Sequence, residues 1–216
     1  MDSLKLLLPT LKLIQNLTIK LSLFMIQIVN SFLQPEQLEQ ARDGFIAAGF
    51  GKWEPESHLV GSGVYDGMGF MGNHALFVSA LMGHVGRPII PNSMFARITN
   101  KDTERAYVHS DRASGAFTCI VYLSDHEEKS GTAFYRHRET GLTEMPLEWM
   151  TDEKRKNEMV NGDESIWQEM DYVAGGFNRA VIFNAPLFHA RVPKNGFGST
   201  PEDGRLVHVI HFFVPQ

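Results

Sequence analysis

Hydrophobic and polar positions along the chain change from mostly helix-like spacing in the first half to mostly strand-like spacing in the second. The pattern predicts helices at about 35–48 and 76–84, the former opened by Pro35 with Glu36 and Glu39 in its early turns. Short apolar or aromatic runs predict strands at 26–32, 94–99, 106–111, 116–123, 132–136, 180–184 and 206–214. This order predicts a mainly β fold with flanking helices, an antiparallel sandwich or barrel whose helices pack on one sheet.

The domain organisation predicted from this pattern is a single domain at residues 25–216, preceded by an apolar N-terminal extension at 1–24. Lysines interrupt the extension, so no apolar run reaches the roughly 18–20 residues that a membrane span needs. A strand or helix packed on the domain, a targeting segment, and an extension outside the natural fold with Met25 as the start are all open. Residues 141–172 form a polar, partly helical insert that acts either as a lid or as a surface subdomain.

Composition and charge exclude several classes of protein. With 43% hydrophobic and 21% charged residues, the chain has the usual globular mixture. The net charge of −5 argues against a nucleic-acid partner, which usually selects a basic surface. The single cysteine, Cys119, forbids an internal disulfide and is typical of a reducing compartment, so we expect a cytoplasmic protein.

The candidate chemistry begins with the triplet His109-Ser110-Asp111. On a strand, positions i and i+2 face the same side, so His109 and Asp111 can offer a nitrogen and an oxygen to one ion. His189, after a later apolar strand, is the best third ligand. Two imidazoles and a carboxylate on one side of an ion leave adjacent positions open, which suits non-haem Fe(II). The simpler alternative is an exposed His-Asp pair at a strand end, since such triplets arise often by chance.

Several motifs in a fixed order strengthen the metal interpretation. In chain order they are Tyr107-Val-His109-Ser-Asp111, Cys119-Ile-Val-Tyr122-Leu-Ser, Ser130-Gly131-Thr-Ala-Phe134-Tyr135, Gly175-Gly-Phe-Asn-Arg-Ala-Val-Ile-Phe183, Phe188-His189-Ala-Arg-Val-Pro193 and Gly204-Arg205-Leu-Val-His-Val-Ile-His-Phe212. Over roughly 94–214 this series resembles the prolyl-4-hydroxylase-like branch of the 2-oxoglutarate and Fe(II)-dependent oxygenases, and most of all its bacterial and phage-type members. The resemblance implies a double-stranded β-helix, the jelly-roll barrel also seen in cupins.

The resemblance also implies roles for individual residues. His109, Asp111 and His189 would be the iron ligands, and Arg205 would bind the distal carboxylate of 2-oxoglutarate. A planar guanidinium suits that task because it can bond a carboxylate through two N–H groups and stays charged when dehydrated. Tyr122 and Thr118, on one face of a strand, are further candidates for holding 2-oxoglutarate. Two features differ from the family pattern around Arg205: Val207 stands where the family often has Ser or Thr, and Arg191 is a competing candidate for the carboxylate.

The activity implied by the resemblance is hydroxylation of a substrate C–H by dioxygen, with release of succinate and CO2 and with ascorbate as an aid. The substrate could be a peptidyl residue, an amino acid or a small metabolite, and the oligomeric state is open. Two rival interpretations are a cupin-like metal protein of other activity and a barrel that binds a partner without catalysis.

Two further groups of residues carry weaker signals. Arg136, His137 and Arg138 form a cationic cluster that either meets an acidic substrate group or lies in a solvated loop. His208 and His211 lie on opposite faces of the last strand, so at most one of them points into the barrel.

Overall fold

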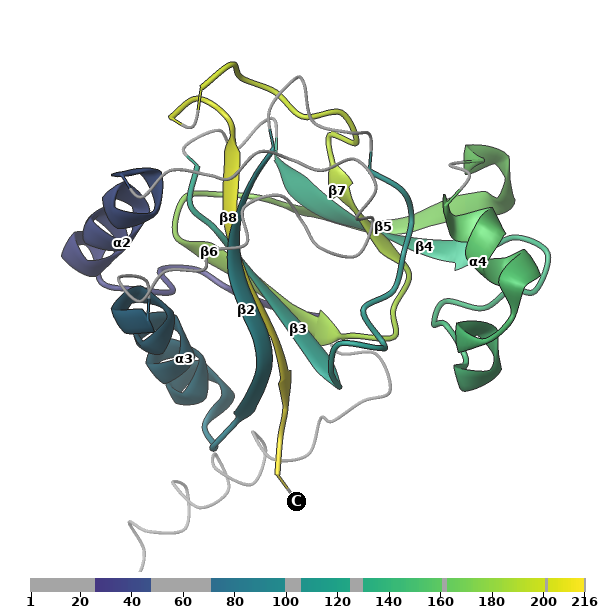
Figure 1. Cartoon of the computed structure of the whole chain (residues 1–216), viewed down its shortest axis with the longest axis horizontal. Helices are drawn as coiled ribbons and strands as arrows, with labels where there is room; N and C mark the ends of the chain where they lie inside the picture. Colours follow the sequence, from purple (N-terminus) through teal and green to yellow (C-terminus); the bar gives the residue numbers. More distant parts are fainter. Residues whose placement is uncertain are drawn as a thin grey trace, which may run out of the picture.

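The computed structural model describes residues 26–47, 71–99, 106–124, 130–160, 163–200 and 202–215. Two antiparallel sheets face each other in the middle of the molecule (Figure 1). The five-stranded sheet has the order β1 (Ile26–Val29), β6 (Arg179–Asn184), β3 (Phe117–Tyr122), β8 (Arg205–Phe213) and β2 (Ile90–Thr99). The three-stranded sheet has the order β5 (Trp167–Ala174), β4 (Gly131–His137) and β7 (His189–Val192). The expected mainly β architecture is therefore confirmed.

Alternation along each strand divides the core into an inner and an outer layer. Val207 and Val209 of β8 face the three-stranded sheet, where they pack with Phe134 of β4 and Phe183 of β6. Leu206, Ile210 and Phe212, at the alternate positions of β8, face the other way, toward the helices. Because side chains alternate with a period of two, one face of the large sheet forms a helix-covered core and the other lines the space between the sheets.

Two helices, α2 (Pro35–Ala47) and α3 (Met71–Val85), cover the outer face of the large sheet (Figure 1). Leu38, Ala41 and Phe45 of α2 are buried at helical spacing, as are Phe77 and Leu81 of α3. The helices therefore leave the space between the two sheets to side chains of the strands and their connecting loops. Among the described residues, no helix is long and apolar enough to cross a bilayer.

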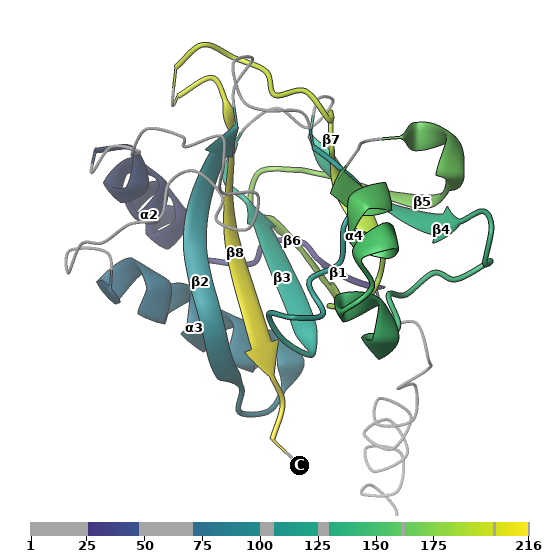
Figure 2. The ribbon, with the colours of Figure 1, turned by 45° about the vertical axis from the view of Figure 1, so that its right-hand side comes forward.

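The insert expected at 141–172 differs from the expectation in its last part, where residues 167–172 belong to strand β5. Its helical part comprises η3 (Leu147–Met150), α4 (Glu153–Val160) and η4 (Glu164–Ile166). Trp149 and Trp167 join a cluster that includes Phe188 and Ala190, on the outer side of the small sheet. Figure 2 shows α4 against this sheet, away from the helices of the large sheet. This position favours a surface subdomain over a lid.

The expected strand at 106–111 is wrong, since only a single bridge, His109 with His189, forms there. Backbone hydrogen bonds join Ala106 to Lys194, His109 to His189 and Asp111 to Ala185. Between the first two bonds this segment advances three residues and its partner five, and between the last two it advances two residues and its partner four. These slips prevent a regular ladder. Strands β5 and β7 were not predicted from the sequence. The N-terminal extension expected at 1–24 lies outside the described residues.

Candidate metal centre

The pairing of His109 with His189 is the foundation of the site. The two residues exchange backbone hydrogen bonds, His109 N–H to His189 O at 2.9 Å and His189 N–H to His109 O at 2.8 Å. Residues paired in this way hold their side chains on the same face of the sheet. The two imidazole rings accordingly lie 4.4 Å apart between their centres. Residues 80 positions apart in the chain are thus brought side by side by main-chain geometry.

Asp111 completes a set of three groups whose ligand atoms all lie within 4.8 Å of one another. Its Oδ1 lies 3.7 Å from His109 Nε2, and its Oδ2 lies 3.4 Å from His189 Nε2. The His109 side chain is 49% exposed, whereas those of Asp111 and His189 are 15% and 4% exposed. The set is therefore anchored in the protein interior and is reached from the His109 side.

Each of the two imidazoles is oriented by a main-chain carbonyl two residues earlier. His109 Nδ1 lies 3.0 Å from Tyr107 O, and His189 Nδ1 lies 2.9 Å from Leu187 O. A carbonyl oxygen can only accept, so both Nδ1 atoms carry hydrogens and the neutral rings present unprotonated Nε2 atoms. In that state both Nε2 lone pairs face the same carboxylate, an arrangement that requires a positive charge between them, either a proton or a metal ion.

The electrostatics of the three groups support this requirement. Burial would raise the pKa of Asp111, but the surrounding imidazoles of His189, His211 and His109 hold the pKa of that carboxyl well below its usual range. Burial opposes protonation of His189, yet the Asp111 carboxylate outweighs it and raises the pKa of His189. Dehydration of the His109 ring, together with electrostatic repulsion from His189, lowers the pKa of His109 to about 4. The carboxylate is thus ionised and needs a positive partner.

A divalent ion fits these three donors. Two neutral imidazole nitrogens and one carboxylate oxygen are suitable ligands for Fe(II), and their binding to one side leaves adjacent positions open. Because the pKa of His189 is raised, an ion would compete with a proton for its Nε2. The donor set lacks the thiolates of a closed structural zinc site, since Cys119 lies on the helix-covered face of β3.

Arg205 is the second chemical feature on the inside of the barrel. The residue is buried, 3% exposed, and its Nε donates to Ser130 Oγ at 3.1 Å and its Nη2 to Gly131 O at 3.3 Å. The guanidinium lies 5.6 Å from the centre of the Tyr122 ring. Burial lowers the pKa of Arg205 because dehydration disfavours its charged form. Among the described residues, none of its partners is a carboxylate.

A close backbone approach shapes the surroundings of Arg205. A Cβ at Gly131 would collide with the Tyr172 ring, so glycine lets that ring lie over the start of β4. The Tyr172 hydroxyl donates to Ser130 O at 3.0 Å, beside the Arg205 contacts. The cation is therefore enclosed by tyrosine rings and main-chain carbonyls.

The other predicted binding residues are divided between the two ends of this inner face. Tyr122 lies beside Arg205 and shares a 2.7 Å hydrogen bond with Thr132, and burial raises the pKa of its phenol. Thr118 instead donates to Asp111 Oδ2 at 2.9 Å, so it lies at the metal-candidate end. Arg191, two residues after His189 on β7, pairs with Thr132 and therefore also faces inward.

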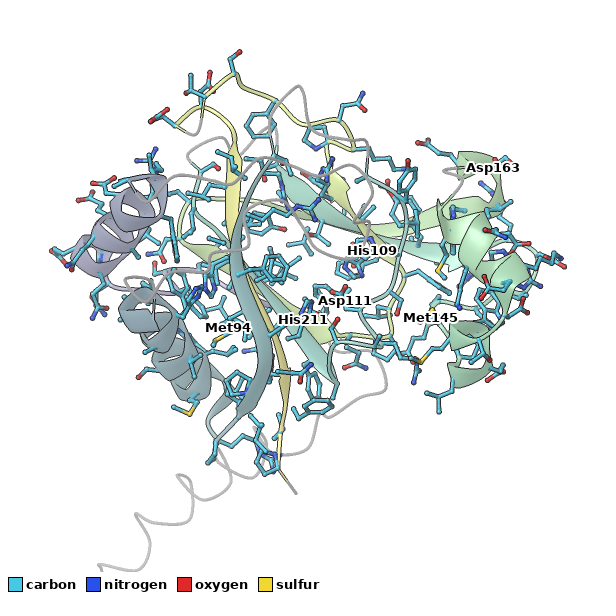
Figure 3. All side chains as sticks on the ribbon, viewed as in Figure 1. Met94, His109, Asp111, Met145, Asp163 and His211 are labelled. Carbon is cyan, nitrogen blue, oxygen red and sulfur yellow. The ribbon has the colours of Figure 1, made fainter. Side chains whose placement is uncertain are left out.

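His211 is a member of the site that the sequence interpretation did not assign. Its Nε2 lies 3.2 Å from Asp111 Oδ2, and Figure 3 shows its ring directed toward Asp111. His208, on the opposite face, packs against the helices, which confirms that only one of the two histidines points inward. Its spacing in the sequence could have identified it: His211 lies six positions after Arg205 on one strand, and residues an even number apart share a face.

The cationic cluster 136–138 is not a solvated loop throughout. His137 is buried between the rings of Trp149 and Trp167, each 5.2 Å away centre to centre. Arg138 donates to Trp167 O at 3.0 Å. His137 therefore anchors the insert on the outer side of the small sheet and does not face the candidate metal centre.

Comparison with known proteins gives a family and a fold. A family model described as "Family of unknown function (DUF6445)" matches residues 81–213, more than half of the chain. No curated protein sequence matches the chain.

Solved structures with a similar fold include the following three proteins. The non-heme alpha ketoglutarate dependent epimerase SnoN from nogalamycin biosynthesis is 16% identical, with a TM-score of 0.54 over 88% of this chain and 78% of that one. The carbocyclase SnoK from the same biosynthesis is 12% identical, with a TM-score of 0.54 over 87% and 78%. HygX from Streptomyces hygroscopicus, solved with iron bound, is 13% identical, with a TM-score of 0.55 over 89% and 83%. At these identities the likeness confirms the double-stranded β-helix fold.

Proposed function

The chain belongs to the DUF6445 family, whose function is unknown, and we propose that it is a 2-oxoglutarate- and Fe(II)-dependent dioxygenase that hydroxylates a substrate C–H. The observation that supports the proposal most strongly is the joint presence of two features in the space between the two sheets. One is the His109–Asp111–His189 set, and the other is a buried arginine, Arg205, whose described partners include no carboxylate. A buried cation of this kind calls for an anionic ligand.

The residues of the chain divide the work between binding and orientation. His109, Asp111 and His189 hold the iron from one side, and Arg205 holds the far carboxylate of 2-oxoglutarate, with Tyr122 beside it. When bound, iron and 2-oxoglutarate supply the oxidising chemistry, in which dioxygen converts a C–H to C–OH while 2-oxoglutarate becomes succinate and CO2.

The walls between the two ends of the site are apolar. Phe134, Phe183, Val207 and Val209 come from both sheets and exclude water from the space between them. A low local dielectric strengthens the pairing of Arg205 with a carboxylate. It also keeps the oxidising centre away from bulk water.

The substrate class draws support from two directions. The sequence motifs are similar to those of the prolyl-4-hydroxylase-like branch, which favours a peptidyl residue or an amino acid. The similar fold of HygX, solved with nickel, 2-oxoglutarate and hygromycin B bound, favours a small molecule. In either case, the more exposed His109 side of the centre is the side from which the substrate arrives.

The direct test is succinate release from 2-oxoglutarate by the purified full chain with Fe(II), ascorbate and dioxygen, with and without candidate substrates. Calorimetric titration with 2-oxoglutarate in the presence of Mn(II) and the absence of oxygen measures binding alone. Binding together with slow substrate-independent succinate release supports the proposal. Neither binding nor succinate would favour a barrel that holds a partner without catalysis.

A cupin-like metal protein is the second candidate, because His211 brings a third imidazole to Asp111. In such a protein His211 would ligate the ion and 2-oxoglutarate would have no role. Metal binding without any affinity for 2-oxoglutarate would favour this candidate.

A further inference from the structure

His211 lies in a chain of polar contacts that ends on Asp111. The residue belongs to β8, its side chain is 8% exposed, and its ring packs 5.9 Å from the Phe95 ring. Its Nδ1 is 2.6 Å from Ser93 Oγ on the neighbouring strand β2. Its Nε2 is 3.2 Å from Asp111 Oδ2. Figure 3 shows His211 and Asp111 facing each other between the sheets.

The direction of the hydrogen bonds follows from the chemistry of the partners. An ionised carboxylate can only accept, so His211 Nε2 must carry the hydrogen that it shares with Asp111. In a neutral ring the other nitrogen, Nδ1, is then an acceptor, and the Ser93 hydroxyl donates to it. All the hydrogen bonds therefore point the same way: Ser93 donates to His211, and His211 donates to Asp111.

Thr118 provides a second donor to the same oxygen. Its hydroxyl lies 2.9 Å from Asp111 Oδ2, on the strand directly beside His211, with which it is paired in register. Within the part of the chain that the structure describes, Asp111 Oδ1 accepts no hydrogen bond. The two oxygens of one carboxylate are thus in different environments: Oδ2 accepts from Thr118 and His211 and lies 3.4 Å from His189 Nε2, whereas Oδ1 lies 3.7 Å from His109 Nε2.

We propose that His211 is a positioning residue that, together with Thr118, holds Asp111 Oδ2 so that Oδ1 alone is offered to the metal ion. The inference rests on the proposed metal centre and deepens it. A carboxylate fixed by its second oxygen binds through one atom, which keeps an extra coordination position open. Residues that orient ligands in this way typically contribute a factor of about 10–100 to metal affinity.

The alternative role for His211 is that of a fourth ligand. Opposite ligands of an octahedral ion lie about 4.3 Å apart when each bond is about 2.1–2.2 Å, so true ligands form a compact set. The set whose atoms all lie within 4.8 Å contains His109, Asp111 and His189 and does not include His211. An Nε2–H that donates to Asp111 also has no lone pair for an ion.

The test compares His211→Leu with His211→Gln in the full chain. Leucine removes the donor, whereas the glutamine amide places an N–H group at similar reach and is a poor ligand. His208→Leu, the same change on the opposite face of β8, is the matched control. The measurements are Mn(II) affinity by calorimetry, thermal unfolding of the metal-free proteins, and the number of coordinated imidazoles in the Cu(II) forms by pulsed electron paramagnetic resonance.

We expect His211→Leu to weaken Mn(II) binding about 10–100-fold, His211→Gln to recover most of it, and the wild type and both variants to show two coordinated imidazoles. Unchanged affinity in both variants, or an equal loss in both, would overturn the positioning role. A count of three imidazoles that falls to two without His211 would make it a ligand. No Mn(II) binding by the wild type would overturn the metal centre itself, and this inference with it.

Discussion

Replacing Arg205 with methionine should separate the binding role of this residue from its structural role. In the structure, the buried guanidinium donates to Ser130 and Gly131 and lies near the Tyr122 ring, and none of these partners is a carboxylate. The proposed partner, a carboxylate of 2-oxoglutarate, would provide the missing negative charge. Methionine keeps a similar volume and removes the charge, so the change should leave little cavity.

The two expected effects differ in size. Removing one member of a buried, hydrogen-bonded charge pair costs about 2–5 kcal/mol, so 2-oxoglutarate affinity should fall about 30-fold to several thousand-fold. For folding, the loss of two hydrogen bonds from a charged donor, about 1.5–3 kcal/mol each, is opposed by the several kcal/mol of dehydration that Arg205 no longer costs. The free energy of unfolding should therefore change by less than about 2 kcal/mol.

The assay is calorimetric titration of 2-oxoglutarate into Mn(II)-loaded protein without oxygen, with urea unfolding of the same samples. Arg191→Met is the matched control, since Arg191 also lies on the inner face and is the competing candidate. A dissociation constant within threefold of the wild type for Arg205→Met would refute the assignment. A large loss for Arg191→Met alone would transfer the role to Arg191.

Three other changes test separate parts of the structure. His109→Ala should abolish iron binding, measured as bound iron per chain, while the metal-free protein unfolds as before; unchanged iron content would show that the ligand assignment is wrong. His208→Leu should reduce the loss of stability at acid pH. Burial and His74 hold the pKa of His208 well below 6.5 in the folded protein, so below pH 6.5 the unfolded chain binds a proton that the folded protein does not. The free energy of unfolding of the wild type therefore falls as the pH drops below 6.5, by at most about 1.4 kcal/mol per pH unit from this residue. Urea unfolding at pH 7.5 and 5.5 measures this slope, and an unaltered slope would contradict the reasoning. Trp149→Ala should lower the free energy of unfolding by about 3 kcal/mol, because Trp149 is buried against His137, yet leave Mn(II) affinity unchanged; weaker Mn(II) binding would show that the insert acts on the metal centre.

The sequence was sufficient for features that depend on local periodicity. The spacing of His109 and Asp111 predicted that both side chains face one ion, and the structure brings them together although 106–111 forms a single bridge and no strand. The parity of β8 likewise allowed only one of His208 and His211 to face inward. These features are set by the two-residue alternation of extended chain, which single sequences display directly.

The features that sequence reasoning missed depend on distant partners. The 106–111 segment has the composition of a strand, but its pairing with 185–194 slips out of register, which depends on that distant segment. Strand β5 was assigned to a helical insert because most of its residues are exposed and polar, as edge positions allow. His137 appeared solvated in a basic stretch, although Trp149 and Trp167 enclose it. Local propensity carries no information about such tertiary neighbours.

The most direct test of the account is a crystal structure of the full chain grown with Mn(II) and 2-oxoglutarate in the absence of oxygen, with the metal located by anomalous scattering. We expect one ion within about 2.0–2.3 Å of His109 Nε2, Asp111 Oδ1 and His189 Nε2, with 2-oxoglutarate reaching from that ion to Arg205. An ion bound elsewhere, or a fully loaded crystal in which these three side chains contact no metal, would contradict the central claim.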